Sequence, residues 1–430
     1  MTESNRRAFL GQSGAAIAAG LTLLPGRSGK AAPSDRVNLA VMGIRGRGGG
    51  LAQSFAALPG SRVTHLVDVD SNLFGQAVPA IAERQGSEPE AVTDFRRVLD
   101  DPDVDALVIG APDHWHAPAT VMACQAGKHV YVEKPASHTL WEGRKMIEAA
   151  RKYDRVVQVG TQSRSTPHYR HVIEEVLRSG RIGTVLQAKA WNSQYRPDLP
   201  EAEDGEPPEG VDYNLWLGPA PERPFNPNRF HYSWHWQWDY GTGDVGNDGV
   251  HDLDIARWGL GVGMPSTVSS TAFKAVNSHW ETPDTAFATF TFPDTPAILV
   301  FEQRDWSPYV QNGFENGVIF YGTEGRIEIG RSGWRLFEGN EEIPVESEPF
   351  SDRPHFEDFL DAIATGRRPH ADIEEGHHSA ALAHLINITA RTGRGFLTLD
   401  PTTEEILNDS EAQSLTRRSY REPFGIPDQV

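Results

Sequence analysis

Short apolar runs alternate with helical patterns through the first third of the chain. The apolar runs are rich in Val, Ile and Leu and fall at 37–43, 61–70, 105–112, 128–135 and 155–162. Helical patterns follow the first run at 51–58 and precede the last run at 141–153. Strands that are buried on both faces of a sheet have continuous apolar sequences. The alternation of such runs with helical patterns therefore predicts a doubly wound α/β domain with a parallel sheet over residues 35–162.

The rest of the chain carries more strand patterns than helical ones. Strands are predicted at 185–191, 286–292, 297–303, 317–322 and 326–330. Helices are predicted at 355–366 and near 375–391, and we expect both to pack back on the first domain. Residues 163–430 are therefore predicted to form a second α/β domain.

One long segment of the second domain has no periodic pattern. It covers residues 191–230, and its first part, 191–210, contains four prolines and six acidic residues. That composition is typical of a solvated loop. We expect an insertion that forms a rim of the molecule or an arm that contacts a neighbouring subunit.

The first residues resemble a targeting segment. The Arg6-Arg7 pair precedes Phe9-Leu10, a mildly apolar run covers 14–24, and small residues follow to Ala32. Such a run is too short for a membrane span of about 20 residues. The pattern resembles a twin-arginine signal, which implies removal of residues 1–31 and export to the periplasm. An ordinary secretory signal or a basic N-terminus without a targeting role is the alternative.

Charge and cysteine content exclude several classes of protein. The formal net charge is −19, from 59 acidic and 40 basic side chains, which disfavours general nucleic-acid binding and adhesion to anionic lipid. Cys124 is the single cysteine of the chain, so an intramolecular disulfide and a cysteine-rich zinc or iron–sulfur site are excluded.

A glycine-rich loop follows the first apolar run. Gly43 and Gly48 match the first and third glycines of the dinucleotide-binding pattern G-x-G-x-x-G, whereas Arg45 stands at the middle position. Backbone N–H groups at the start of the next helix would hold a pyrophosphate. We predict a Rossmann domain in which Gly46 restores the close backbone approach that Arg45 removes. A flexible turn is the alternative.

Asp68 ends the second apolar run, about 25 residues after Gly43. An acidic side chain at this point of a Rossmann domain bonds the ribose hydroxyls of NAD, and its charge would repel the 2′-phosphate of NADP. Asp70 could take the same role or could cap the next helix. We therefore predict NAD as the cofactor, with NADP less favoured.

Further motifs carry a family resemblance. Glu133-Lys134-Pro135 follows a strand pattern, and residues 112–118 read P-D-H-W-H-A-P. With the glycine loop, they resemble the Gfo/Idh/MocA family of NAD(P)-dependent sugar oxidoreductases over about residues 36–425, and the segments at 158–165 and 246–259 resemble a branch of exported members. The resemblance implies a Rossmann domain and then an α/β domain with an open, mainly antiparallel sheet, with substrate held between that sheet and the nicotinamide.

The resemblance assigns the chemistry to Lys134 and His251. Lys134 is the lysine of the family motif and would donate or accept a proton, while Glu133 would position the cofactor or the backbone. His251 is the general acid/base candidate, with a buried structural histidine as the alternative. In the family pattern D-x-G-x-H an aspartate stands four residues before the histidine, but this chain has Asn247 there and Asp248 one residue later. An asparagine can bond a sugar hydroxyl or cap a helix, but it cannot take a proton. We expect both Asn247 and Asp248 to bind the substrate.

Four residues near these motifs are further candidates. Arg164 and His168 follow the last strand of the first domain, and we expect them to line the substrate cleft. His114 and His116 have a spacing that suits a metal, but no third or fourth ligand is evident, so we predict no metal site. His116 is instead expected to contact the cofactor.

An aromatic cluster precedes the His251 segment. Trp234, Trp236 and Trp238 alternate with polar residues, so in an extended chain they would share one face. They would either stack on sugar rings or fill a core.

These residues predict an exported NAD-dependent dehydrogenase that acts on a CH–OH group of a carbohydrate. Lys134 or His251 would remove the hydroxyl proton, and the other would hold the oxygen. One alternative is an NAD-dependent glycoside hydrolase that uses transient oxidation and elimination. Another is a non-catalytic sugar-binding protein. We expect a homo-oligomer, either a dimer or a tetramer, and neither nucleic acid nor membrane as a partner.

Overall fold

The computed structural model describes residues 36–307 and 309–430. The targeting segment predicted at 1–31, with Arg6 and Arg7, lies outside these described residues. Every helix of the described part is too short or too polar to span a lipid bilayer.

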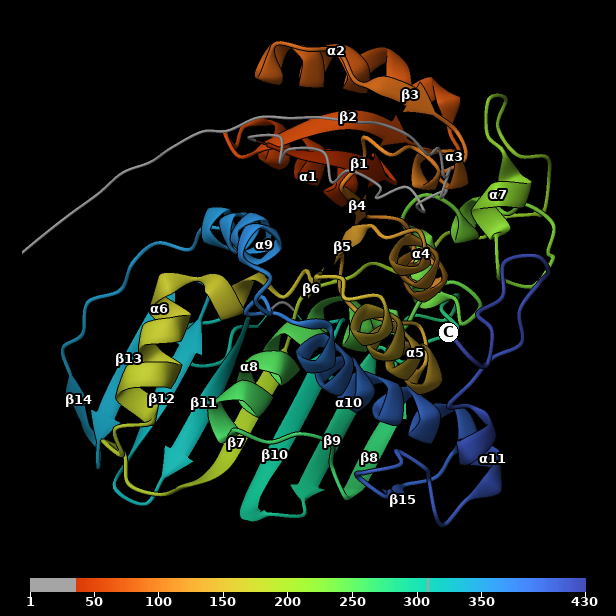
Figure 1. The fold of residues 1–430 in the computed structure, drawn as a ribbon. Coiled ribbons are helices and arrows are strands. Elements are labelled where there is room, and N and C mark those ends of the chain that lie inside the picture. The colour runs from red at the N-terminus through yellow and green to blue at the C-terminus, as the bar shows by residue number, and fades with distance from the viewer. Residues whose placement is uncertain (1–35, 308) are drawn as a thin grey trace, which may run out of the picture. The chain divides into compact units, whose positions relative to one another are not determined.

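Six parallel strands of the described residues form the first sheet, in the order β3-β2-β1-β4-β5-β6 (Figure 1). The direction of winding reverses between β1 and β4, as in a doubly wound nucleotide-binding domain, so the predicted parallel sheet is confirmed. The strands are β1 Val37–Met42, β2 Ser61–Val67, β3 Glu90–Val92, β4 Ala106–Ile109, β5 His129–Val132 and β6 Val157–Val159. The helices between them are α1 Arg47–Ala56, α2 Phe74–Gln85, α3 Arg96–Leu99, α4 Asp113–Gln125 and α5 Leu140–Lys152.

A second sheet contains nine strands of the described chain, in the order β14-β13-β12-β11-β7-β10-β9-β8-β15. Of the neighbouring strands, β7 and β10 run parallel and the other pairs run antiparallel, so the predicted mainly antiparallel sheet is confirmed. The strands are β7 Val185–Asn192, β8 Thr267–Phe273, β9 Thr285–Phe292, β10 Thr295–Arg304, β11 Asn316–Gly322, β12 Gly325–Gly330, β13 Gly333–Glu338, β14 Glu341–Ile343 and β15 Phe396–Thr398.

Helices cover one face of the second sheet (Figure 1). These are α6 Pro167–Arg170, the π-helical η3 His171–Leu177, α8 Val250–Leu260 and α10 Ile373–Thr392. They meet the sheet in a large apolar core that includes Leu253, Phe301 and Phe320. On the opposite face Phe273 is 50% exposed and Phe287 is 51% exposed, so large apolar side chains there lie open to solvent.

The C-terminal third of the chain returns to the first sheet, as predicted. Phe356 and Phe359 of α9 (Arg353–Thr365) pack on Phe55 of α1 and Tyr131 of β5. On the other side of the sheet, Phe424 joins the core that the Rossmann helices form, after the short helix α11 (Ser410–Ser414). The core of the first domain is therefore completed by residues from the end of the chain.

The insertion after β7 is only partly the solvated loop that its composition predicts. Residues 201–210 are mostly exposed, but the next thirty residues enclose an apolar cluster of their own around Trp216, Phe230 and Tyr240. This part contains α7 Tyr213–Leu217 and the 3₁₀ turns η4 Pro227–Arg229 and η5 Ser233–Trp236. It is attached to the Rossmann domain next to β2, where the Asp212 N–H donates to the Val69 carbonyl at 2.8 Å.

The three tryptophans of this segment do not share one face, because the chain turns through η5 instead of running extended. Trp236 stacks on Trp280 with ring centroids 4.4 Å apart. Trp238 lies 5.2 Å from the Arg391 guanidinium. Trp234 is buried and is the member of the three that lines the main cavity described below. Packing therefore accounts for two of them.

Candidate active site

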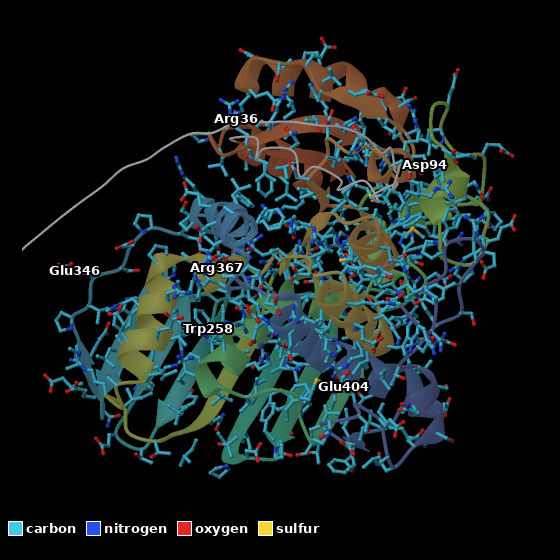
Figure 2. The ribbon with its side chains drawn as sticks, in the orientation of Figure 1. Arg36, Asp94, Trp258, Glu346, Arg367 and Glu404 are labelled. Carbon is cyan, nitrogen blue, oxygen red and sulfur yellow. The ribbon has the colours of Figure 1, made fainter. Side chains whose placement is uncertain are left out.

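A cavity of about 480 Å³ lies at the carboxyl ends of β1, β2, β4 and β5. Its wall on the Rossmann side includes the glycine loop, Asp68, Asp113 and Lys134, and also Asp94 after β3, which Figure 2 labels. The opposite wall comes from the aromatic insertion and from Asn247. This is the point where strand order reverses, which is where ligands bind in open α/β sheets.

The glycine loop is shaped for a close approach between β1 and α1. Gly43 has φ +78°, and a Cβ built on it would lie 2.7 Å from the Ala111 nitrogen. A Cβ on Gly48 would lie 1.6 Å from the Gly43 carbonyl oxygen. Gly46 adopts φ 56° and ψ −117°, yet a Cβ there would meet no atom within 4 Å. Gly46 therefore leaves open space at the start of α1, where a phosphate would be bound. Arg45 is exposed and lines the same cavity.

Asp68 faces this cavity at the end of β2. Its carboxylate accepts hydrogen bonds from the Ile44 N–H at 2.8 Å and from the Asp70 N–H at 2.9 Å. Burial raises the pKa of Asp68 from 3.8 to about 6, although these backbone donors act in the opposite direction. Asp70 instead caps the 3₁₀ turn η1 (Ser71–Leu73) through the Asn72 N–H. Of the two acids, Asp70 has the capping role.

Lys134 is fixed by Asn247 across the cavity. The Lys134 Nζ donates to the Asn247 carbonyl at 2.7 Å and to the Asn247 Oδ1 at 2.8 Å. The Asn247 Nδ2 donates to the buried Asp244 at 2.9 Å, which orients the amide so that its oxygen faces the lysine. The ammonium group has three N–H donors, so one remains for a ligand.

Asn247 is not the helix cap that its position suggested. It lies inside the π-helical turn η6 (Val245–Gly249), which continues into α8, so the helix begins before it. A π turn places residue 247 where both its carbonyl and its side chain reach Lys134. Such turns are frequent at functional sites.

His251 lies one turn further along the same helix. It is 8% exposed, does not line the cavity, and its ring makes no hydrogen bond with the described residues. Burial holds the pKa of His251 well below its ordinary value, and the charges of Arg331 and Lys134 lower it further. The ring is therefore neutral, and the same burial and cationic neighbours make it a weaker base than a free imidazole. That His251 and Lys134 serve one substrate position stays a prediction.

Glu133 pairs with the glycine loop. It accepts from the Arg47 Nε at 2.7 Å, and both residues line the cavity. Arg47 also pairs with Asp352 at 3.0 Å, just before α9. Glu133 therefore positions the loop through Arg47.

Two predicted substrate ligands lie elsewhere. Arg164 is buried and binds Asp254 at 2.8 Å and Glu375 at 3.1 Å, while its guanidinium lies 5.4 Å from the ring of Trp258, which is labelled in Figure 2. His168 is buried, and its Nε2 faces the Gly330 carbonyl at 3.3 Å. Neither residue lines the cavity, so both predictions are corrected: these side chains hold the second domain together.

Asp248 is also turned away from the cavity. It forms an ion pair with Arg196, which lies 3.3 Å from Asp244 as well. The guanidinium joins the two acids, and its Nη1 also donates to the Tyr232 hydroxyl at 3.4 Å. The expected substrate contact by Asp248 is therefore replaced by a structural ion pair.

The two histidines of the 112–118 segment contact backbone carbonyl groups. The His116 ring nitrogens face the Pro135 carbonyl at 2.7 Å and the Ala111 carbonyl at 2.9 Å, so no ring nitrogen is left for a cofactor although the residue lines the cavity. His114 is buried, and its Nε2 lies 2.9 Å from the Trp216 carbonyl. In the described part of the chain, no group of three or more His, Cys, Asp or Glu side chains is arranged to hold a metal.

Two cavity residues escaped the sequence analysis. Asp113 is buried, accepts from the Thr242 hydroxyl at 2.8 Å, and has its pKa raised to about 6 by burial. The His235 Nδ1 lies 2.5 Å from the Tyr232 carbonyl, so Nδ1 carries the proton and Nε2 is free to accept one. Burial and then the charge of Lys134 lower the pKa of His235 to about 3. Asp113 directly follows a strand run and could have been identified, whereas His235 belongs to a turn that the alternating pattern did not indicate.

Comparison with known proteins agrees with this architecture. Residues 37–161 match the oxidoreductase family NAD-binding Rossmann fold, and residues 189–426 match the C-terminal alpha/beta domain of the same family. The chain belongs to the Gfo/Idh/MocA family of oxidoreductases.

Among the relatives, inositol 2-dehydrogenase 2 of Saccharopolyspora erythraea is 29% identical over 357 residues, which cover 78% of this chain and 88% of that protein. Two solved structures share the fold. The aldose-aldose oxidoreductase of Caulobacter crescentus has a TM-score of 0.66 at 23% identity, over 85% of this chain and 100% of that one. A levoglucosan dehydrogenase complex with NADH and L-sorbose has a TM-score of 0.66 at 19% identity, over 85% of this chain and 99% of that one.

Proposed function

We propose that this protein is an NAD-dependent dehydrogenase that transfers hydride between a secondary alcohol carbon of a carbohydrate and nicotinamide. The observation that carries the proposal is the Lys134 ammonium, held at 2.7–2.8 Å by Asn247 in the wall of the cavity that the glycine loop and Asp68 also line. Relatives named for inositol, levoglucosan and aldoses point to the same substrate class.

The residues present fit NAD. The open backbone at Gly46 offers N–H donors for a pyrophosphate, and Asp68 offers a carboxylate for ribose hydroxyls while disfavouring a 2′-phosphate. When bound, NAD supplies the hydride acceptor or donor. The chain supplies everything else that the reaction needs.

Lys134 and a neutral histidine divide the work on the alcohol. The free N–H of Lys134 is suited to bond the substrate oxygen, since its two other donors are held by Asn247. We assign to His251, one turn along the helix from Asn247, the role of the base that receives the hydroxyl proton during oxidation and returns it during reduction. Asn247 replaces the family aspartate by fixing the lysine without taking a proton itself.

The test is turnover with a panel of sugars. Purified protein is incubated with NAD and inositol, aldoses or levoglucosan, and NADH is followed by absorbance. Lys134→Ala should lower the rate about 100-fold or more, whereas the control variant Lys145→Ala, whose lysine lies outside the cavity and pairs with Glu148 on α5, should retain it. Absence of NADH production and of NADH oxidation with every sugar and its ketone would refute a net dehydrogenase.

The hydrolase alternative is separated in the same assay. Glycosides are offered with NAD, and both the released sugar and NADH are measured. One NADH formed for each product supports the dehydrogenase, and released sugar without net NADH supports the hydrolase.

Export and assembly complete the proposal. The Arg6-Arg7 segment supports export to the periplasm through the twin-arginine pathway. The uncovered face of the second sheet, with exposed Phe273, Phe287 and Tyr321, supports a homo-oligomer formed through that face.

A further inference from the structure

A second cavity, of about 230 Å³, lies behind the 241–243 segment. Its walls come from several parts of the chain: the start of α5, Pro221, the segment at 238–242, the last turns of α10 and the segment at 415–419. Of the residues discussed below, only Thr242 and His114 also appear in the description of the active site.

The floor of this second cavity presents two hydrogen-bond acceptors. Asn387 is 5% exposed; its Nδ2 donates to the Thr242 carbonyl at 2.6 Å, and its buried Oδ1 has no partner among the described residues. The His138 Nε2 donates to the Gly241 carbonyl at 3.2 Å, and its buried Nδ1 also has no partner in the described part of the chain. A carbonyl can only accept, so the proton is on Nε2 and the His138 Nδ1 is an acceptor. Buried acceptors without partners are costly unless a ligand supplies donors.

The rim presents cations. Arg418 uses Nε on Glu142 at 2.7 Å and Nη2 on the His114 carbonyl at 2.6 Å, while its buried Nη1 has no partner among the described residues. Arg391 makes no ion pair within 4 Å with any carboxylate of residues 36–307 or 309–430 and lies 5.2 Å from the Trp238 ring. The charges of Asp239, which lines the same cavity, and of Glu281 act on it, but both of these acids pair with Arg223. Arginine fits a carboxylate better than any other side chain does, because its planar fork can donate two parallel bonds.

The acceptors on the floor of the second cavity and the guanidinium groups at its rim indicate the chemical class of its ligand. The acceptors require hydroxyl donors, the arginines require an anion, and the Trp238 indole adds an apolar wall of the kind that packs on sugar carbons. We propose that this second cavity binds a small sugar acid, a uronate or an aldonate, with its hydroxyl groups on Asn387 and His138 and its carboxylate on Arg391 and Arg418. The site is separate from the dehydrogenase site and does not rest on the proposed function.

Two variants test the site without disturbing the buried ion pair of Arg418. Arg391→Gln removes one exposed rim cation. Ser419→Trp fills the cavity from its exposed edge. The matched control is Arg178→Gln, which removes an exposed positive charge far along the chain, on the segment after η3.

Binding of D-glucuronate and D-gluconate is measured by calorimetry on the protein saturated with NAD, with D-glucose and inorganic phosphate as comparison ligands. At least one sugar acid should bind more tightly than glucose and phosphate. Arg391→Gln should weaken that binding by about 10-fold or more, and Ser419→Trp should abolish it, while Arg178→Gln leaves it unchanged. The proposal is overturned if neither acid binds, if glucose or phosphate binds as tightly, or if both cavity variants bind like the wild type. Circular dichroism and NADH binding confirm that each variant is folded.

Discussion

The contact between Gly48 and Gly43 makes a quantitative prediction about the cofactor loop. In a Gly48→Ala variant the new Cβ would lie 1.6 Å from the Gly43 carbonyl oxygen, about half of an ordinary contact distance. Both groups are backbone or attached directly to it, so no side chain can rotate to make room. The start of α1 must therefore move away from the end of β1.

The cost follows from overpacking a tightly built site. Inserting one methyl group into a packed core costs about 1–3 kcal/mol, and this site lies at the upper end because only backbone can yield. With an unfolding entropy of about 2.1 cal/mol/K per residue over residues 36–430, a loss of about 3 kcal/mol lowers Tm by about 4 °C. NADH affinity should fall by about 10-fold or more, since the same movement displaces the N–H groups at the start of α1.

Gly50→Ala is the matched control, two residues along the same helix. A Cβ at Gly50 would meet no atom within 4 Å, so alanine gains up to about 1 kcal/mol of helix propensity and Tm should rise by about 1 °C. Both variants are measured by calorimetric melting and by NADH fluorescence titration. If Gly48→Ala melts and binds NADH like Gly50→Ala, the close approach is not a feature of the protein and the reasoning fails.

Four further outcomes are expected. Lys134→Ala and His251→Ala should each lower turnover about 100-fold while NADH titration stays near wild type; near-normal turnover would remove that residue from the mechanism. Asp68→Ala should weaken NAD binding and reduce the ratio of the affinity for NAD to the affinity for NADP. If the wild-type protein binds NADP as tightly as NAD, Asp68 does not bind the ribose hydroxyls. The pKa of Asp68 rises from 3.8 to about 6 on folding, so the folded protein binds this proton more tightly than the unfolded chain does. The stability that this proton contributes is complete below pH 3.8 and is lost as the pH rises through 6. In denaturant melts, the free energy of unfolding of the wild type should therefore rise by up to about 3 kcal/mol relative to that of Asp68→Ala when the pH is lowered from 7 to 4. A difference between the two proteins that stays constant with pH would contradict the burial of the charge. Replacing the Arg6-Arg7 pair with lysines should leave the full-length chain in the cytosol, and normal periplasmic accumulation on fractionation would argue against twin-arginine export.

Local pattern was sufficient for the sheets because each strand is a continuous or alternating apolar run. The parallel run that ends at Met42 is buried on both faces over its last four residues, and period two is clear in β9, where Ala286, Ala288 and Phe290 point inward. The fold of the insertion after β7 could not be predicted from local pattern. Its apolar core depends on contacts between residues far apart along an irregular chain, such as Trp216 with Tyr240.

The residues of the site also fall into two groups, those that local sequence predicts and those that tertiary contacts decide. Gly43, Asp68 and Lys134 are found by sequence because each lies within two residues of the end of a strand, where chain order alone fixes position, and Gly48 is found because it completes the glycine pattern that Gly43 begins. Arg164 also follows a strand, yet it meets Asp254 of α8, and no pattern in the sequence announces that pairing.

Asn247 shows the limit most clearly. An asparagine after glycines suggests a cap, but the π turn adds one residue to the helix and directs the amide to a lysine 113 residues away in sequence. Only the tertiary fold decides between these two roles.

The return of the chain to its first sheet has a consequence for synthesis. Phe356 and Phe359 close one face of that sheet and Phe424 joins the core on the other. A ribosome that has just produced β6 has therefore released a nascent sheet with both apolar faces incomplete, and the faces stay incomplete until residues 356–424 have been synthesised. Transiently exposed apolar surface of this kind is prone to aggregation, which is the hazard that chaperones counter.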